Sequence, residues 1–175
     1  MQKKVFGDVT IPKNKIYKDN LKKEIKNIKE DIIKDCLKTK SKTVLSFNFQ
    51  VFTKHHNKLY SLFIDSCKKK LKKFSVVNNP TKLWSYFTDK NFHEGDIWHN
   101  HIGTCTICGV LYLETAKDCG IEFEDNNKII YIEPKNYDLL IFPGSLNHRP
   151  IISNNKKRIS INFEVFCHES INQIF

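Results

Sequence analysis

The sequence lacks any long apolar run. No uninterrupted hydrophobic stretch approaches the ~20 residues that a helix needs to cross a bilayer. The N-terminal segment Met1–Phe6 leads into no apolar core of a signal peptide. We therefore expect a cytoplasmic protein with no membrane segment.

A second metal-binding cysteine pair is also missing. The chain has six cysteines, and only Cys105 and Cys108 form a C-x-x-C pair. A structural zinc site normally takes two such pairs, which argues against zinc. A thioredoxin-type site begins a helix, whereas residues 104–113 have the pattern of a strand. We predict six reduced, partly buried thiols and no disulfide.

Acidic residues are too few to balance the basic ones. The chain has 29 Lys and Arg against 19 Asp and Glu, which gives a net charge of +10. The lysines are densest at Lys68–Lys70 and Lys72–Lys73, and no arginine is interleaved with them, so the nucleic-acid signature is weak. We predict a solvated helix face with weak attraction for nucleic acid or an acidic partner.

Residues 1–80 have mainly helical periodicity. Apolar side chains recur at spacings of three and four along residues 17–38, which predicts one amphipathic helix. The same spacing predicts a second helix over residues 56–74. Between them, residues 44–53 alternate as in a strand or an extended bridge, and Asn78–Pro80 then breaks the chain.

Residues 81–167 contain short apolar runs separated by Gly, Asp, Asn and Pro, which is typical of an antiparallel barrel or sandwich. The expected strands are residues 83–87, 104–113, 120–123, 128–132, 137–142 and 159–166. A chain of 175 residues is long enough for one domain with its own core. We predict a single domain over residues 1–175 of the α+β class, mainly β, with the N-terminal helices packed on one face of the β core.

Three histidines are candidate metal ligands. His99 and His101 stand two positions apart ahead of an apolar strand, and side chains at i and i+2 of a strand share a face. His148 follows the expected strand 137–142 and can supply a third imidazole from a neighbouring strand. A triangle of ligands on one side of the ion leaves other positions open, as in non-haem iron sites. We predict that these three side chains bind one Fe(II) ion.

A strand with an arginine in it is the second candidate feature. Arg158 opens the alternation RISINF, so that Arg158, Ser160 and Asn162 share one face and apolar side chains share the other. A guanidinium pairs with a carboxylate through two hydrogen bonds, and Ser160 adds a hydroxyl donor. Arg158 follows His148 by ten positions. A pocket with both features can take 2-oxoglutarate, which chelates iron at one end and needs a cation at the other.

The stretch from Trp84 to Phe166 resembles the 2-oxoglutarate- and Fe(II)-dependent oxygenases of the prolyl-hydroxylase-like group. The matching elements, in the family's order, are Trp84, Gly95-Asp96, His99-Asn100-His101, the strand Cys108–Leu113, the turn Phe142–His148 and the strand Arg158–Phe163. The resemblance implies a double-stranded β-helix, or jelly-roll, core over residues 81–167. It also implies an oxidoreductase that hydroxylates its substrate with release of succinate and CO2.

The resemblance further implies roles for single residues. His148 would be the distal iron ligand, and Arg158 with Ser160 would hold the C5 carboxylate of 2-oxoglutarate. The hydroxyl of Tyr112 would reach the same carboxylate, and Asn162 would line the pocket. The resemblance names no substrate, which could be a small molecule or a macromolecule.

One position departs from the family. Most members have His-x-Asp or His-x-Glu where this chain has His99-x-His101. All three imidazoles could bind the metal, as in thiol dioxygenases. Alternatively, His101 is the first ligand and Gly103 leaves a position vacant, or Asp96 supplies the carboxylate. A metal-binding jelly roll also suits a cupin-like sensor or isomerase, although such a protein needs no carboxylate anchor.

Overall fold

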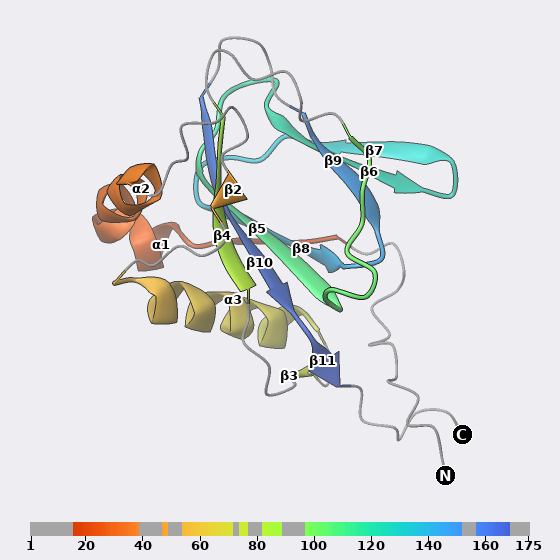
Figure 1. Cartoon of the computed structure of the whole chain (residues 1–175), viewed down its shortest axis with the longest axis horizontal. Helices are drawn as coiled ribbons and strands as arrows, with labels where there is room; N and C mark the ends of the chain where they lie inside the picture. The colour runs from red at the N-terminus through yellow and green to blue at the C-terminus, as the bar shows by residue number, and fades with distance from the viewer. Residues whose placement is uncertain are drawn as a thin grey trace.

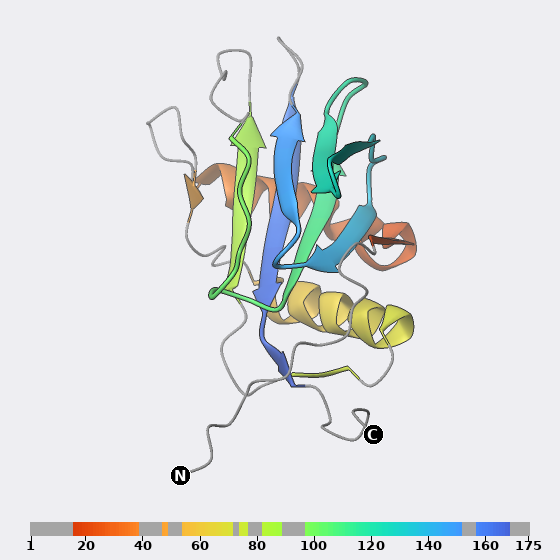
Figure 2. The ribbon, with the colours of Figure 1, turned by 90° about the vertical axis from the view of Figure 1, so that its right-hand side faces the viewer.

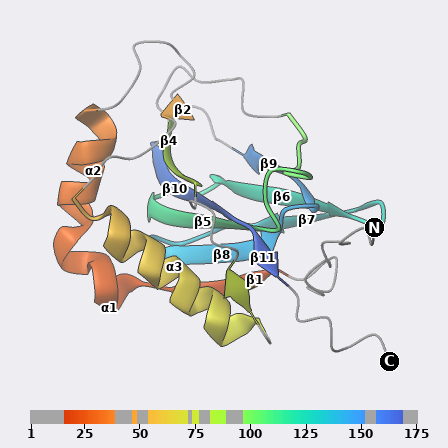
Figure 3. The same cartoon turned by 60° about the horizontal axis from the view of Figure 1, so that its bottom comes forward.

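The computed structural model describes residues 16–38, 47–48, 54–71, 74–76, 82–88, 97–151 and 157–168. Two antiparallel β-sheets face each other, and the helices cover the outer face of the larger sheet (Figure 1, Figure 3). Figure 2 views the molecule from the side of the smaller sheet. Among these residues, no helix is both long and apolar enough to span a membrane.

The larger sheet has six strands in the order β1-β8-β5-β10-β4-β2. Their bounds are β1 Tyr17–Asn20, β2 Phe47–Asn48, β4 Lys82–Thr88, β5 Ile107–Glu114, β8 Asp138–Pro143 and β10 Arg158–Val165. The smaller sheet has the order β7-β6-β9, with β6 Gly120–Asp125, β7 Lys128–Ile132 and β9 Asn147–Ile151. A third pair joins β3 Ser75–Val76 to β11 Cys167–His168.

The N-terminal helical segment starts later than the periodicity predicts. Residues 17–20 form β1, which pairs with β8, so the prediction of a helix from Tyr17 is wrong for its first turn. The ion pair between Lys18 Nζ and Asp138 Oδ2 at 2.6 Å helps to hold β1 at this edge. Pairing with a sheet edge here overrides the local helical preference. The helices that follow are α1 Lys22–Ile25, the 3-10 turn η1 Lys26–Ile28, α2 Lys29–Lys38 and α3 His56–Lys70.

Alternation along the strands divides the core into two layers. The odd-numbered residues of β10, from Ile159 to Val165, pack with the buried faces of the helices. Phe63 of α3 stacks on Phe163 with ring centroids 4.6 Å apart. Its ring lies where a Cβ at Gly109 would stand, so only glycine allows α3 to lie this close to β5. The predicted packing of the helices on one face of the β core is therefore confirmed.

The second layer lies between the two sheets. It contains Cys105, Cys108, Val110, Tyr112, Ile121, Phe123, Leu140, Phe142 and Leu146. The six cysteines of the chain are all free thiols, as predicted, and all of them are buried more fully than the prediction of partial burial. The predicted chain break at Asn78–Pro80 lies outside the described residues, and so does the segment 44–53 apart from β2.

The strand β9 is absent from the sequence prediction. The expected strands correspond to β4, β5, β6, β7, β8 and β10, with small shifts at their ends. β9 contains Pro150, which cannot donate a ladder hydrogen bond and is normally confined to edge strands. β9 is such an edge, because within the smaller sheet it pairs with β6 on one side only.

Candidate metal centre

Backbone pairing brings two distant histidines together. His99 forms an isolated antiparallel bridge with His148 of β9, in which each N–H donates to the other residue's carbonyl at 3.0 and 2.9 Å. The N–H of His101 donates to the carbonyl oxygen of Gly144 at 2.7 Å. The prediction that His99 and His101 belong to a regular strand is wrong, because only His99 takes part in a bridge. His148 also belongs to β9 rather than to the end of β8.

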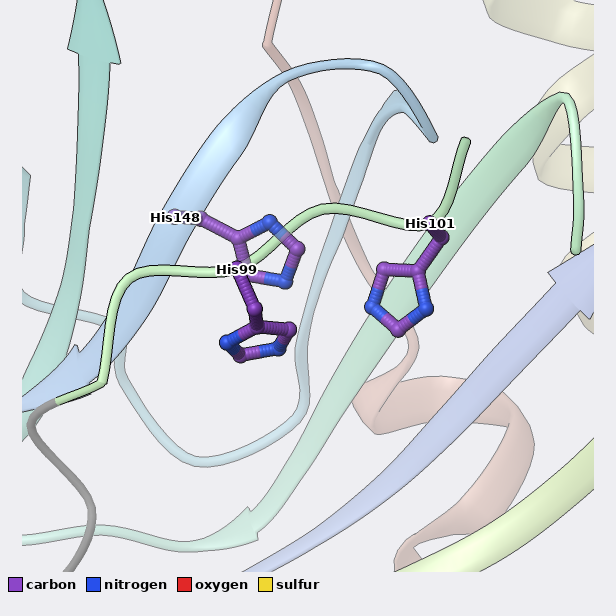
Figure 4. Close-up of side chains that lie close together, drawn as sticks. All are labelled: His99, His101 and His148. Atoms are coloured by element: carbon purple, nitrogen blue, oxygen red, sulfur yellow. The ribbon is translucent and has the colours of Figure 1, made fainter. Parts of the chain in front are cut away.

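The three imidazoles nevertheless converge (Figure 4). One ring nitrogen of each histidine lies within 4.8 Å of a ring nitrogen of the other two. The ring centroids are 4.4 Å apart for His99 and His148, 5.2 Å for His101 and His148, and 5.3 Å for His99 and His101. This is the spacing of side chains that can share one small cation.

Hydrogen bonds set the same tautomer on each ring. The acceptors of the three Nδ1 atoms are the carbonyl of Ile97 for His99 at 3.0 Å, the carbonyl of Leu146 for His148 at 2.9 Å and Glu164 Oε1 for His101 at 2.6 Å. In the neutral form of each ring, an Nδ1 that donates to an oxygen carries the ring's one N–H proton. The lone pair is then on Nε2, which is the arrangement of a metal-binding histidine.

Burial differs across the cluster. His148 is 5% exposed and packs edge-on against Phe142 with centroids 4.8 Å apart, whereas His99 is exposed. Burial, together with the neighbouring His99 and His101, lowers the pKa of His148 to about 3, although the hydrogen bond to Leu146 opposes this shift. His148 is therefore a neutral ligand at physiological pH, and solvent reaches the cluster from the side of His99.

A row of polar side chains leads inward from the cluster along β10. Arg158, Ser160, Asn162 and Glu164 alternate with the residues that face the helices, so they face the space between the sheets. Arg158 is 3% exposed and Ser160 is fully buried. Polar groups this deep in a core require partners or a ligand.

Tyr112 of β5 lies directly across from Ser160. Its hydroxyl accepts a hydrogen bond from Arg158 Nη2 at 3.4 Å, and the guanidinium lies 5.0 Å from the centre of its ring. Burial raises the pKa of the Tyr112 hydroxyl, and Arg158 partly opposes this shift. Tyr86 of β4 faces the guanidinium from the other side at 5.5 Å. Two aromatic rings therefore hold the cation in place.

Ser160 Oγ is the clearest sign of a ligand pocket. It is buried and has no hydrogen-bond partner within the part of the chain that the structure describes. A hydroxyl beside a guanidinium and a phenol can donate to a carboxylate. Arg158, Ser160 and Tyr112, which the sequence resemblance assigns to one carboxylate, thus lie together in the structure.

No protein-family model matches the sequence, and no curated protein matches it significantly. Solved structures with similar coordinates include a prolyl hydroxylase from Trichoplax adhaerens in complex with a hypoxia inducible factor oxygen degradation domain peptide. It is 15% identical with a TM-score of 0.62 over 87% of this chain and 84% of that one. A prolyl-4-hydroxylase from Pseudomonas putida is 10% identical, with a TM-score of 0.61 over 89% and 93%.

A third similar structure is the viral collagen prolyl hydroxylase of Paramecium Bursaria Chlorella virus-1, which is 13% identical with a TM-score of 0.54 over 90% of this chain and 91% of that one. The chain has the double-stranded β-helix fold. The fold that the sequence motifs imply is therefore confirmed, and at these identities the likeness concerns the fold alone.

Sequence reasoning missed two residues of this β-helix site. Glu164 continues the even-numbered alternation of β10, so its position on the pocket face could have been read from the pattern. Tyr86 gave no such signal, because its contact with Arg158 depends on the pairing of β4 with β10. Of the alternatives for the third ligand, Asp96 lies outside the described residues. Gly103 stands in the turn after His101 with a φ of +84°, a conformation that favours glycine whether or not a ligand is missing there.

Proposed function

We propose that the protein is a cytoplasmic Fe(II)- and 2-oxoglutarate-dependent oxygenase that hydroxylates its substrate and releases succinate and CO2. One observation supports this most: ring nitrogens of three histidines converge at one end of a polar row that leads to the buried Arg158. A metal centre joined to a carboxylate anchor is what a chelating keto dicarboxylate requires. The likeness to prolyl hydroxylases in fold supports the same proposal.

The donor set fits Fe(II). Imidazole nitrogen is a suitable ligand for this ion, and three ligands on one side leave positions for a chelating cosubstrate and for oxygen. His99, His101 and His148 would hold the ion. The outer hydrogen bonds on all three Nδ1 atoms already orient the rings for this task.

The inner end of the row fits the far carboxylate of 2-oxoglutarate. Arg158 would form the charge-assisted hydrogen bonds, and Ser160 and Tyr112 would add hydroxyl contacts. Asn162 lies between this group and Glu164 and would line the pocket midway. About four residues of strand, or roughly 13 Å, separate Ser160 from Glu164, enough to contain a five-carbon dicarboxylate and a metal.

The chain's own residues would position the reactants and exclude water. When bound, iron and 2-oxoglutarate supply the oxidising chemistry. Phe123 and Phe142 pack against His148, with ring centroids 6.0 and 4.8 Å away, and would shield this side of the ring from water. The exposed side at His99 is where a substrate would enter.

The direct test is anaerobic binding. Addition of Fe(II) and then 2-oxoglutarate should produce a weak metal-to-ligand charge-transfer absorption band at about 500 nm, because the keto acid chelates the metal. Succinate replaces 2-oxoglutarate in the control, since it has the carboxylates but no keto group to chelate, and should give no band. Oxygen added with a true substrate should then release succinate from 2-oxoglutarate. No band with 2-oxoglutarate under saturating Fe(II) would contradict the proposal.

A second candidate rests on the all-imidazole cluster. Three neutral ligands are also the set of thiol dioxygenases, and a cupin-like sensor or isomerase needs only a metal. Such a protein would bind Fe(II) without forming the 2-oxoglutarate band. Oxygen uptake with Fe(II) and a small thiol, in the absence of 2-oxoglutarate, would favour this candidate.

We also propose that the basic surface attracts nucleic acid or an acidic partner weakly. Lys68, Lys69 and Lys70 are exposed in the last turn of α3. The binding constant for duplex DNA is measured at several salt concentrations. Replacing all three lysines with glutamine should make the slope of its logarithm against the logarithm of salt concentration shallower by about 0.9 for each lost phosphate contact. The control replaces the exposed Lys22, Lys23 and Lys26. An equal reduction in both variants would show general charge attraction and no defined surface.

A further inference from the structure

Glu164 of β10 offers a carboxylate to one histidine of the cluster. Its Oε1 lies 2.6 Å from Nδ1 of His101, and its side chain is 7% exposed. The Nδ1 atoms of His99 and His148 donate instead to backbone carbonyls. Within the described part of the chain, His101 is therefore the ring of the three that contacts a carboxylate.

The surroundings of Glu164 make its burial costly. It faces the space between the sheets and pairs in register with Cys108 of β5, whose thiol is buried. The pKa of that thiol is raised by burial first, then by Cys105 and by the nearby Glu164. A carboxylate in such a place is unfavourable unless positive charge compensates it. A neutral imidazole compensates less than an imidazole bound to a cation does.

The histidine at position 101, where most related oxygenases have Asp or Glu, suggests a role for the Glu164 carboxylate. Where His-x-Asp supplies a negatively charged ligand, His99-x-His101 supplies two neutral ones. We propose that Glu164 is the positioning residue of His101 and, through its Nδ1–H, provides the negative charge that the ligand set lacks. A carboxylate behind a metal-bound imidazole orients the ring and raises its basicity as a ligand. This inference rests on the proposed metal site.

The first experiment compares Glu164→Gln with Glu122→Gln by anaerobic titration with Fe(II) alone against a competing chelator. Glutamine keeps an oxygen that can accept from Nδ1 but removes the charge. We expect E164Q to bind Fe(II) about 10- to 100-fold more weakly than the unaltered protein. Glu122 bonds Arg149 at 2.8 Å in the smaller sheet, and E122Q should bind as the unaltered protein does. Equal affinities for E164Q and E122Q would overturn the proposal.

In a protein that also carries His101→Asp, we expect E164Q to change Fe(II) affinity in the opposite direction. His101→Asp restores the charged ligand and places it near Glu164, so the two carboxylates repel each other. E164Q should therefore raise Fe(II) affinity when His101 is aspartate, although it lowers affinity when His101 is present. A decrease of the same size in both backgrounds would mean that Glu164 acts on the fold alone.

A measurement on the unaltered sequence covers the case in which E164Q does not fold. Protein labelled with 15N-histidine is titrated with Zn(II), a diamagnetic probe. The Nδ1 proton of His101 should resonate further downfield than those of His99 and His148, since it alone donates to a carboxylate. Three equivalent Nδ1 protons would overturn the proposal. If the unaltered protein binds no Fe(II), the proposed function fails first; if it binds Fe(II) and E164Q binds equally well, only the role of Glu164 fails.

Discussion

Replacement of His148 by alanine should lower Fe(II) affinity by more than about 100-fold, which exceeds the cost of losing only an outer hydrogen-bond partner of a ligand. His148 is the most buried member of the cluster, and its Nδ1 is held by the carbonyl of Leu146. No described side chain of the cluster can replace it, because its β9 position brings it opposite His99. The affinity is measured by anaerobic Fe(II) titration against a chelator.

His56→Ala is the matched control. His56 is the first residue of α3, which covers the outer face of the larger sheet, whereas His148 belongs to β9 of the smaller sheet (Figure 1). Removal of the His56 side chain should therefore leave the affinity unchanged. Because His148 packs against Phe142, thermal unfolding of both metal-free variants checks that each is folded. A folded His148→Ala protein that binds Fe(II) as tightly as His56→Ala does would exclude the three-histidine site.

Alternation explains why the pocket face of β10 could be predicted. Arg158, Ser160 and Asn162 share a face in any extended strand, so no tertiary information is needed to group them. The same rule places Ile159, Ile161 and Phe163 against the helices, as the structure has them. The prediction of the His cluster assumed the i, i+2 geometry of a strand for His99 and His101. In the structure these residues converge with His148 through one isolated bridge and a turn.

Other features depend on contacts that the sequence pattern does not contain. Residues 17–20 form β1 because they pair with the edge of β8, which lies about 120 residues further along the sequence. β9 is hidden by Pro150, which is tolerated because this strand lies at a sheet edge. Tyr86 reaches Arg158 only through the register of β4 with β10. Each of these depends on pairing between distant segments, and local propensity contains no signal for it.

Arg158→Gln should leave Fe(II) binding intact and weaken 2-oxoglutarate binding by about 100-fold, or about 2.7 kcal/mol, within the range for removing one partner of a buried charge pair. Arg158 is 3% exposed between the rings of Tyr112 and Tyr86, so a carboxylate brought to it would be shielded from water. Lysine at the same position keeps the charge but loses the planar fork. The 2-oxoglutarate affinity of Arg158→Lys should therefore lie between that of the unaltered protein and that of Arg158→Gln. Calorimetric titration of 2-oxoglutarate into the Mn(II)-loaded protein measures both.

The other arginine of the chain provides the control for this prediction. Arg149 of β9 bonds Glu122 at 2.8 Å and lies 4.7 Å from the centre of the Trp98 ring, away from the polar row of β10. Arg149→Gln removes the same charge from the protein, so it reproduces any general electrostatic effect on a dianion. R158Q and R149Q should differ in 2-oxoglutarate affinity only if Arg158 binds the carboxylate directly. If R158Q and R149Q bind 2-oxoglutarate equally well, the carboxylate is held elsewhere and the polar row of β10 is not its pocket.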